Sequence, residues 1–135
     1  MPKSCIVDSG ALAALLDPRE EHHPWAREIF FRQPGPWLTC EAVVSEAFFL
    51  LHEPHARALE KLLRGGQLRL ELNLADELVQ VLDLRAKYAD VPMSLADACL
   101  VRMTETLPDP VVLTTDSDFK IYRRHSRQVV PCLLP

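Results

Sequence analysis

The chain has 135 residues, 48% hydrophobic and 25% charged, which fits one domain with a core of useful size. Its net charge of −4 argues against nonspecific coating of a polyanion. No apolar run approaches the roughly 18 residues of a membrane helix, and Asp8 interrupts the first apolar run too early for a signal-peptide core. We therefore expect a cytoplasmic protein of one domain, residues 1–135.

The first half of the chain is predicted to alternate short β-branched strands with helices. Ser9 is a candidate N-cap, Pro24 has a first-turn position, and Gly65 is a helix stop signal. In chain order, the predicted elements are a strand at residues 4–8, helices at 9–17 and 23–33, a turn and short strand at 34–39, and helices at 40–53 and 55–66.

The second half continues the same alternation. The apolar residues Leu78, Val81, Leu82 and Leu84 predict a long amphipathic helix. The predicted elements are a strand at residues 68–72, helices at 75–90 and 94–107, a strand at 110–115, a short helix at 117–124 and a last strand at 129–134. Strands that alternate with helices indicate a three-layer α/β domain around a parallel sheet.

Cysteine and histidine are not the expected ligands of a metal. None of the four cysteines forms a C-x-x-C pair, and their apolar or small neighbours predict buried, reduced thiols. Among the histidines, only the stretch HEPH has near-ligand spacing, and a proline lies inside it. Any metal site is therefore expected to use oxygen ligands.

Two carboxylates follow predicted strands. Asp8 ends the stretch SCIVD, and Asp116 follows VVLTT near the end of the chain. Ligand sites in open α/β sheets lie beyond the carboxyl ends of the strands, at the point where the strand order reverses. If the first and fourth strands are neighbours, Asp8 and Asp116 share one edge of that crevice.

Two further acids are unusual in their predicted helices. Glu46 lies in AVVSEAFFLL, where its helical neighbours Ala42, Val43, Phe49 and Leu50 predict a buried stripe. An unpaired charge in such a stripe is costly and needs a cation or a function. A second acid, in the stretch MSLADACLV, lies in the first turn of an apolar-rich helix; it is Asp97.

Each acid except Glu46 also has a structural interpretation. Asp8 and Asp116 are candidate helix caps, and Ser94-x-x-Asp97 fits a capping box. A mid-helix Glu46 offers no cap, and four structural acids are a less economical interpretation than one shared site. A cluster of carboxylate oxygens suits Mg²⁺ or Mn²⁺, and such ions promote phosphodiester cleavage. We therefore predict a metal site formed by Asp8, Glu46, Asp97 and Asp116.

A basic stretch, KIYRRHSR, follows the last acid. Lys120, Arg123, Arg124 and Arg127 are either a solvated face or a set of groups that positions RNA phosphates beside the acids. No aromatic-interleaved stretch predicts a platform for single-stranded nucleic acid.

The motifs IVDSGALAALL, TCEAVVSEAFFLL, SLADACLV and VVLTTDSDF, in this order, resemble those of PIN-domain ribonucleases of the VapC toxin type. The resemblance covers essentially the whole chain. It implies a five-stranded parallel sheet of order 3-2-1-4-5 and the acid set Asp8, Glu46, Asp97 and Asp116. It also implies that Asp118 is a supporting carboxylate and that Thr115 is the accompanying hydroxyl.

The same resemblance implies an RNA substrate, a cognate antitoxin that blocks the site, and a homodimer. In the family that this chain resembles, the helix after the acid corresponding to Asp97 is usually rich in alanine. Arg102 and Thr104 interrupt that pattern here. The role of Glu41, an additional acid, is open; a favourable first-turn charge is one interpretation.

Two other classes of protein remain as alternatives. One is a non-catalytic PIN-like module that keeps its acids but serves in binding or assembly. The other is a phosphatase or phosphotransfer domain. It is disfavoured because Asp8-Ser9-Gly10 lacks the D-x-D pattern after the first strand, and because Lys120 is poorly placed.

Overall fold

The structure is a computed structural model that describes residues 2–135. Its first half follows the predicted alternation, with element ends within a few residues of those expected. The elements are β1 (Ser4–Val7), α1 (Ser9–Leu16), α2 (His23–Arg32), β2 (Trp37–Thr39), α3 (Glu41–Leu50) and α4 (His55–Arg64).

The second half contains β3 (Leu68–Leu70), α5 (Leu74–Lys87), α6 (Leu95–Thr106), β4 (Pro110–Leu113), the 3₁₀ helix η1 (Ser117–Lys120), β5 (Arg123–Arg124), β6 (Gln128–Val129) and β7 (Cys132–Leu133). Asn73 caps α5 through its side chain, and Ser94 caps α6. Both caps are side-chain oxygens that satisfy free N–H groups of a first turn.

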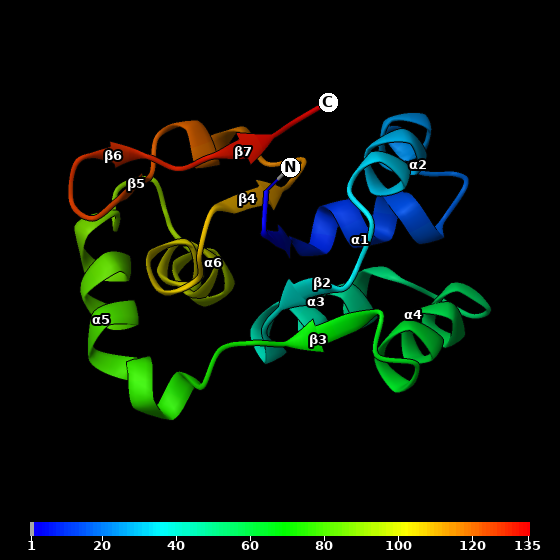
Figure 1. The fold of residues 1–135 in the computed structure, drawn as a ribbon, viewed down its shortest axis with the longest axis horizontal. Coiled ribbons are helices and arrows are strands. Elements are labelled where there is room, and N and C mark those ends of the chain that lie inside the picture. Colours follow the sequence, from blue (N-terminus) through cyan, green and yellow to red (C-terminus); the bar gives the residue numbers. More distant parts are fainter. Residues whose placement is uncertain (1) are drawn as a thin grey trace.

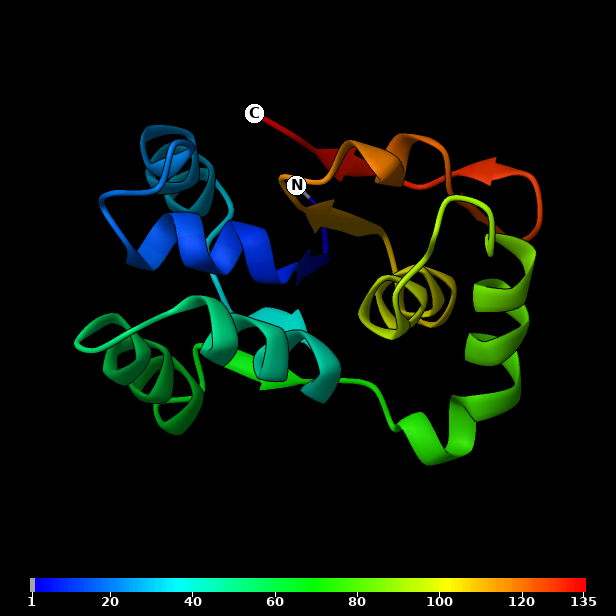
Figure 2. The same cartoon turned by 180° about the vertical axis from the view of Figure 1, so that it is seen from behind.

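The five-stranded sheet has the order β3-β2-β1-β4-β7, and every pair is parallel. This confirms the predicted order 3-2-1-4-5, with β7 as the fifth strand. Figures 1 and 2 show α5 and α6 on one side of the sheet and α1 to α4 on the other. The chain order reverses between β1 and β4, so their carboxyl ends form the switch point of this sheet.

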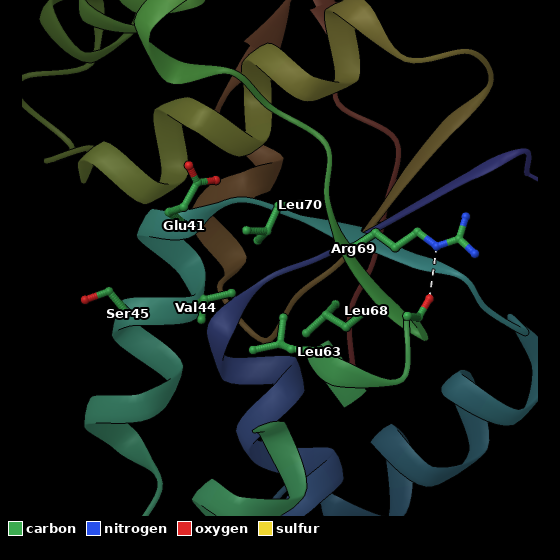
Figure 3. A pocket seen from close by; sticks show the side chains of 8 residues that line it. Glu41, Val44, Ser45, Leu63, Leu68, Arg69 and Leu70 are labelled. Atoms are coloured by element: carbon green, nitrogen blue, oxygen red, sulfur yellow. Dashed lines mark hydrogen bonds between the residues drawn. The ribbon is translucent and has the colours of Figure 1, made fainter. Parts of the chain in front are cut away.

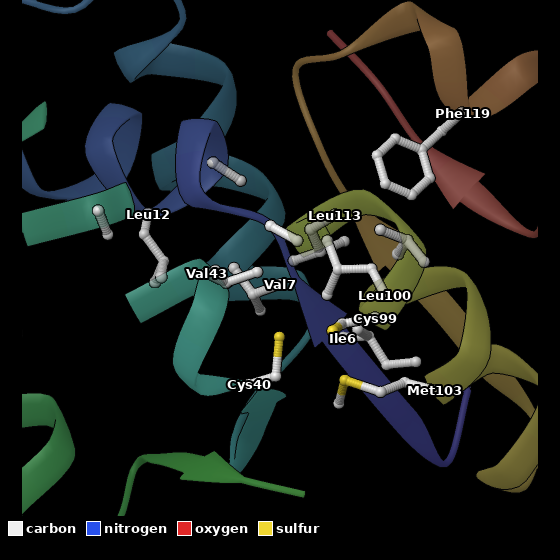
Figure 4. Packing of buried hydrophobic residues seen from close by; sticks show 14 of the residues in the cluster. Ile6, Val7, Leu12, Cys40, Val43, Cys99, Leu100, Met103, Leu113 and Phe119 are labelled. Carbon is white, nitrogen blue, oxygen red and sulfur yellow. The ribbon is translucent and has the colours of Figure 1, made fainter. Parts of the chain in front are cut away.

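The core lies on both faces of β1 and β4. Ile6 and Val7 of β1 and Leu113 of β4 are fully buried. Figure 4 shows Leu12 and Val43 from one helical layer packing on this sheet, and Leu100 and Met103 of α6 from the other. Strands buried on both faces explain why β1 and β4 are continuous apolar runs rather than alternating ones.

The cysteine prediction is confirmed with one exception. Cys5, Cys40 and Cys99 are buried and free, as expected, whereas Cys132 in the edge strand is partly exposed. Burial raises the pKa of the Cys5 thiol to about 12, which keeps it protonated and unreactive.

Two predictions about the secondary structure near the C-terminus are wrong in part: the helix at 117–124 is shorter, and the strand at 129–134 is divided into β6 and β7. The short helix at 117–124 ends at Lys120, and Arg123–Arg124 instead pairs antiparallel with Gln128–Val129 in a hairpin. His125 and Ser126, with φ of 47° and 70°, form the turn of this hairpin. The antiparallel pairing competes with the helical pattern and replaces it.

The helix predicted at 75–90 exists as α5, but only Val81 and Leu84 of its four predicted apolar residues pack on the core. Val81 is fully buried, whereas Leu78 and Leu82 are 43% and 48% exposed. The neighbouring Val79 is 67% exposed. Helix α5 therefore leaves an apolar strip on the surface. Within residues 2–135, no helix has the length and apolar character to cross a bilayer.

Candidate active site

Asp8 lies between β1 and α1 and is the N-cap of α1; of the two candidate caps, Asp8 and Ser9, the structure confirms Asp8. Its carboxylate accepts a hydrogen bond from the Ser9 amide at 2.7 Å and another from the Thr114 hydroxyl at 2.7 Å. Its own amide donates to the Leu113 carbonyl at 3.0 Å, which extends the pairing of β1 with β4. The two strand ends therefore meet at Asp8, and the carboxylate is 5% exposed.

Thr114 connects Asp8 to Asp116. Its hydroxyl donates to Asp8 Oδ2 and accepts the amide N–H of Asp116 at 3.0 Å. Asp116 then caps η1, because its Oδ1 accepts the amide N–H of Asp118 at 2.9 Å. The stretch TTDSD thus fixes two acids through one series of hydrogen bonds.

Asp97 is the third residue of α6 and completes the predicted capping box with Ser94. The Ser94 hydroxyl accepts the Asp97 amide at 3.0 Å, and Asp97 Oδ2 accepts the Ser94 amide at 3.3 Å. The buried hydroxyl of Tyr122 donates to the same Oδ2 at 3.0 Å. Helix capping and a position in the cavity are compatible here, because the Asp97 carboxylate completes the capping box and Asp97 also lines the cavity.

Glu46 does not lie in a buried stripe, and that prediction is wrong. Val43 is buried, but Phe49 and Leu50 are 85% and 47% exposed, and Glu46 itself is an exposed residue. Its carboxylate accepts a long hydrogen bond of 3.4 Å from the Ser9 hydroxyl at the start of α1. The acid is placed by the packing of α3 against α1, not by enclosure in the core.

One cavity of about 260 Å³ brings the four predicted acids together at the carboxyl ends of β1 and β4. Gly10 allows the close approach of α1 to this edge, since a Cβ there would overlap the hydroxyl oxygen of Thr115. The cavity is lined by Asp8, Ser9, Gly10, Glu46, Leu50, Ser94, Asp97, Thr115 and Asp116.

Three of the acids have raised pKa values. Burial raises the pKa of Asp8 to about 6, against the hydrogen bonds from Thr114 and Ser9, and the charges of Asp97 and Glu46 add to the rise. Desolvation, then the charge of Asp97, raises the pKa of Glu46. Desolvation is the largest cause that raises the pKa of Asp97, and the charge of Asp116 raises it by a smaller amount. The four acids therefore act on one another electrostatically.

The family follows from the sequence as well as from this geometry. A model of the PIN domain family matches residues 5–124. The chain belongs to the PIN domain family.

A solved structure supports the fold of this PIN domain. VapC20 from Mycobacterium tuberculosis, described as a toxin that cleaves the sarcin–ricin loop, superposes with a TM-score of 0.76. The two chains are 22% identical over 87% of this chain and 94% of that one. No curated protein sequence matches this chain.

The donor set of the cavity fits a hard divalent cation in its chemistry. Within residues 2–135, no Lys, Arg or His makes an ion pair with any of the four acids. Nor does that part of the chain contain three or more acidic, His or Cys side chains gathered closely enough to form a finished metal site. Binding of one ion by these acids would therefore need their carboxylates to move closer together.

The two supporting residues have different places from those expected. Thr115 lines the cavity, but the hydroxyl that bonds to the acids is that of Thr114. Asp118 does not line the cavity; its amide supports Asp116, and its charge raises the pKa of Tyr122 after the effects of burial and Asp97. Adjacent threonines at a strand end leave the choice between them open, and Tyr122 has no sequence signal.

The four basic residues are in two different environments. Lys120 and Arg127 are exposed. Arg123 is partly buried and its guanidinium donates to main-chain carbonyls of residues 120–122, while Arg124 donates to the carbonyl of Thr104 in α6. The guanidinium groups of Arg123 and Arg124 thus already have protein partners, and the exposed pair is better placed to meet phosphate.

A second, larger hollow lies between α3 and the edge strand β3, outside the acidic cavity. Figure 3 shows Val44, Leu63, Leu68 and Leu70 around it, with Glu41 at its rim. Its volume is about 560 Å³ and its lining is mostly apolar. Glu41 belongs to this apolar hollow and not to the acidic cavity.

Proposed function

We propose that this PIN domain is a divalent-metal-dependent endoribonuclease that hydrolyses RNA phosphodiester bonds. The observation that carries the proposal is the acidic cavity itself. Four carboxylates from segments far apart in the sequence line one cavity, and none is paired with a cation of the described chain. Such a set is costly without a positive partner and gains one when a metal binds.

The acids have separate roles in this proposal. Asp8, Asp97 and Asp116 would hold the metal, and Glu46 at the cavity rim would bind it or orient the attacking water. Bound Mg²⁺ or Mn²⁺ supplies an activated water and stabilises charge on the leaving oxygen. The supporting donors Ser9 and Thr114 keep the carboxylates oriented through the hydrogen bonds described above.

The substrate side of the proposal rests on the exposed cations. Lys120 ends η1, the helix that Asp116 caps, and Arg127 lies in the hairpin that follows. Both would contact RNA phosphates by charge alone, without reading the sequence.

We also propose that the protein is the toxin of a toxin–antitoxin pair in the cytoplasm and forms a homodimer. The exposed apolar residues support protein partners, since large exposed apolar groups mark interaction surfaces. Phe49 and Leu50 line a hollow that shares Ser9 and Glu46 with the acidic cavity, so an antitoxin bound there would block the site.

The apolar strip on α5 is a candidate dimer contact. Light scattering and co-purification with the product of a neighbouring reading frame test both.

Cleavage of mixed cellular RNA, with Mg²⁺ or Mn²⁺ and with excess chelator, tests the enzymatic proposal. We expect cleavage with metal, none with chelator, and none in Asp116→Asn. Asn keeps the capping oxygen for η1, so this variant should be at least as stable as the wild type without metal. Asp83→Asn, an exposed acid of α5, is the matched control and should cleave normally.

The binding-module alternative predicts the opposite result. A protein that binds metal but leaves every RNA intact under these conditions would support the non-catalytic interpretation. Cleavage that persists in chelator would contradict the metal mechanism.

A further inference from the structure

We infer that Tyr122 is a positioning residue that orients Asp97 for metal binding, an inference that rests on the proposed metal-dependent function. The Tyr122 side chain is fully buried and does not line the acidic cavity. Its hydroxyl donates to Asp97 Oδ2 at 3.0 Å. Tyr122 therefore reaches the site only through this carboxylate.

The hydrogen bonds of Asp97 are all on one oxygen. Oδ2 accepts from the Ser94 amide as well as from Tyr122. In residues 2–135, no donor bonds to Oδ1 of the same carboxylate. Two donors on Oδ2 fix the rotation of the group and leave Oδ1 without a donor from residues 2–135, in a residue that lines the cavity.

Tyr122 is itself held by aromatic packing. Its ring lies edge-to-face with Tyr88, the C-cap of α5, and with Phe119 of η1, each at 5.2 Å between centroids. The Tyr88 hydroxyl accepts the amide of the next residue, Arg123, at 2.9 Å. The phenol has little freedom, so its oxygen stays where Asp97 needs a donor.

The hairpin of residues 123–129 adds a second constraint from α6, the helix that carries Asp97. The amide of His125 donates to Glu105 Oε2 at 2.7 Å, and the Arg124 guanidinium donates to the carbonyl of Thr104. The chain that leaves Tyr122 is thus bound to α6 at its far end. Tyr122 and Asp97 keep their relative position because both are fixed to one helix.

The test is Tyr122→Phe, which removes one oxygen and keeps the ring. Mn²⁺ binding, measured by calorimetry on the full chain, should weaken by about 10-fold. RNA cleavage at limiting Mn²⁺ should lose kcat with KM for RNA unchanged, and saturating Mn²⁺ should restore much of it. Replacement of Tyr122 by para-aminophenylalanine returns an N–H donor and should recover wild-type Mn²⁺ affinity.

Tyr88→Phe is the matched control, since it removes the hydroxyl of the adjacent ring. It keeps the ring contact with Tyr122 and loses only the hydrogen bond to the Arg123 amide, so its loss of Mn²⁺ affinity should be much smaller than that of Tyr122→Phe. In the Asp97→Asn background, Tyr122→Phe should have no further effect on Mn²⁺ binding, because the two residues act as one unit.

Unchanged Mn²⁺ affinity in a folded Tyr122→Phe variant would overturn the inference, as would equal losses in Tyr88→Phe. If Tyr122→Phe does not fold, the para-aminophenylalanine variant decides: weak Mn²⁺ binding in that folded protein also contradicts the inference. A wild-type protein that binds no Mn²⁺ would instead refute the proposed function, so the two failures are distinguishable.

Discussion

Helix α1 has an aspartate at each end, and the two aspartates differ in almost every physical respect except their small exposed area. Asp8, the N-cap, is 5% exposed and lies deep between β1 and β4, with Glu46 and Asp97 as its charged neighbours. Asp17, the C-cap, is 8% exposed and lies near the surface under its own partner Arg19.

The pKa values of the two groups move in opposite directions. That of Asp8 rises to about 6, mainly through burial. That of Asp17 falls to about 2, mainly through hydrogen bonds from the Arg19 side chain and amide, with smaller effects of the Arg19 and His55 charges. A buried acid without a cation costs stability that an acid with its own arginine does not. The proposed metal ligand Asp8 therefore differs physically from Asp17, whose partner is within the protein.

The largest expected difference is in catalysis. Asp8→Asn should lower metal-dependent RNA cleavage on the order of 10³-fold, because a proposed metal ligand is lost. Asp17→Asn should leave the cleavage rate unchanged. Initial rates on one RNA at equal concentrations of folded protein measure both. Equal losses in the two variants would show that the loss comes from damage to α1.

The pH dependence of stability should have opposite slopes for the two ends. The folded-state pKa of Asp8 lies above its ordinary value of 3.8, so ionised Asp8 destabilises the fold, and stability should fall as pH rises from about 4 to about 6. Its share is at most about 3 kcal/mol, at roughly 1.4 kcal/mol per pKa unit.

Asp17 should act in the other direction. Its folded-state pKa of about 2 lies below 3.8, so its stabilisation is present above about pH 4 and is lost as pH falls toward 2. Urea unfolding without metal across this range measures both effects. Asp8→Asn should flatten the fall between pH 4 and 6, and Asp17→Asn should flatten the loss below pH 4; a wild-type curve with neither slope would contradict the comparison.

A bound metal should offset the destabilisation caused by ionised Asp8 and should have no such effect at Asp17. Added Mn²⁺ should stabilise the wild type and Asp17→Asn by about 2.7 kcal/mol at 100 times its dissociation constant. In Asp8→Asn, this gain should be much smaller at the same concentration. Thermal unfolding with and without Mn²⁺ gives the difference, and an unchanged gain in Asp8→Asn would remove this residue from the site.

The smallest expected effect concerns Lys120 and Arg127, the exposed cations that lie outside the acidic cavity. Lys120→Ala with Arg127→Ala should lower the salt dependence of RNA binding by a slope of about 2, because fewer counterions are released. Arg57→Ala with Arg64→Ala, on α4 away from the hairpin, is the control with the same charge change. Equal slopes in both pairs would leave Lys120 and Arg127 as solvated surface.

The local signals of the sequence predicted elements and caps well. The alternation of strands and helices gave the layers, and the resemblance of its motifs gave the order β3-β2-β1-β4-β7 that the structure confirms. Asp8 and Asp116 became candidates because a strand end followed by an acid is visible in the sequence, and Asp97 because an acid in the first turn of an apolar-rich helix is a local feature.

Only tertiary structure decided which groups support those acids. Thr114 bonds to Asp8 across 106 positions of the chain, and Tyr122 bonds to Asp97 across 25. The exposure of Glu46 and the hairpin at residues 123–129 likewise depend on contacts between separate elements, not on residue type. Backbone propensity and capping act over a few residues, and so they can be read from sequence. Hydrogen bonds between distant segments form only where packing brings two groups to within about 3 Å of each other.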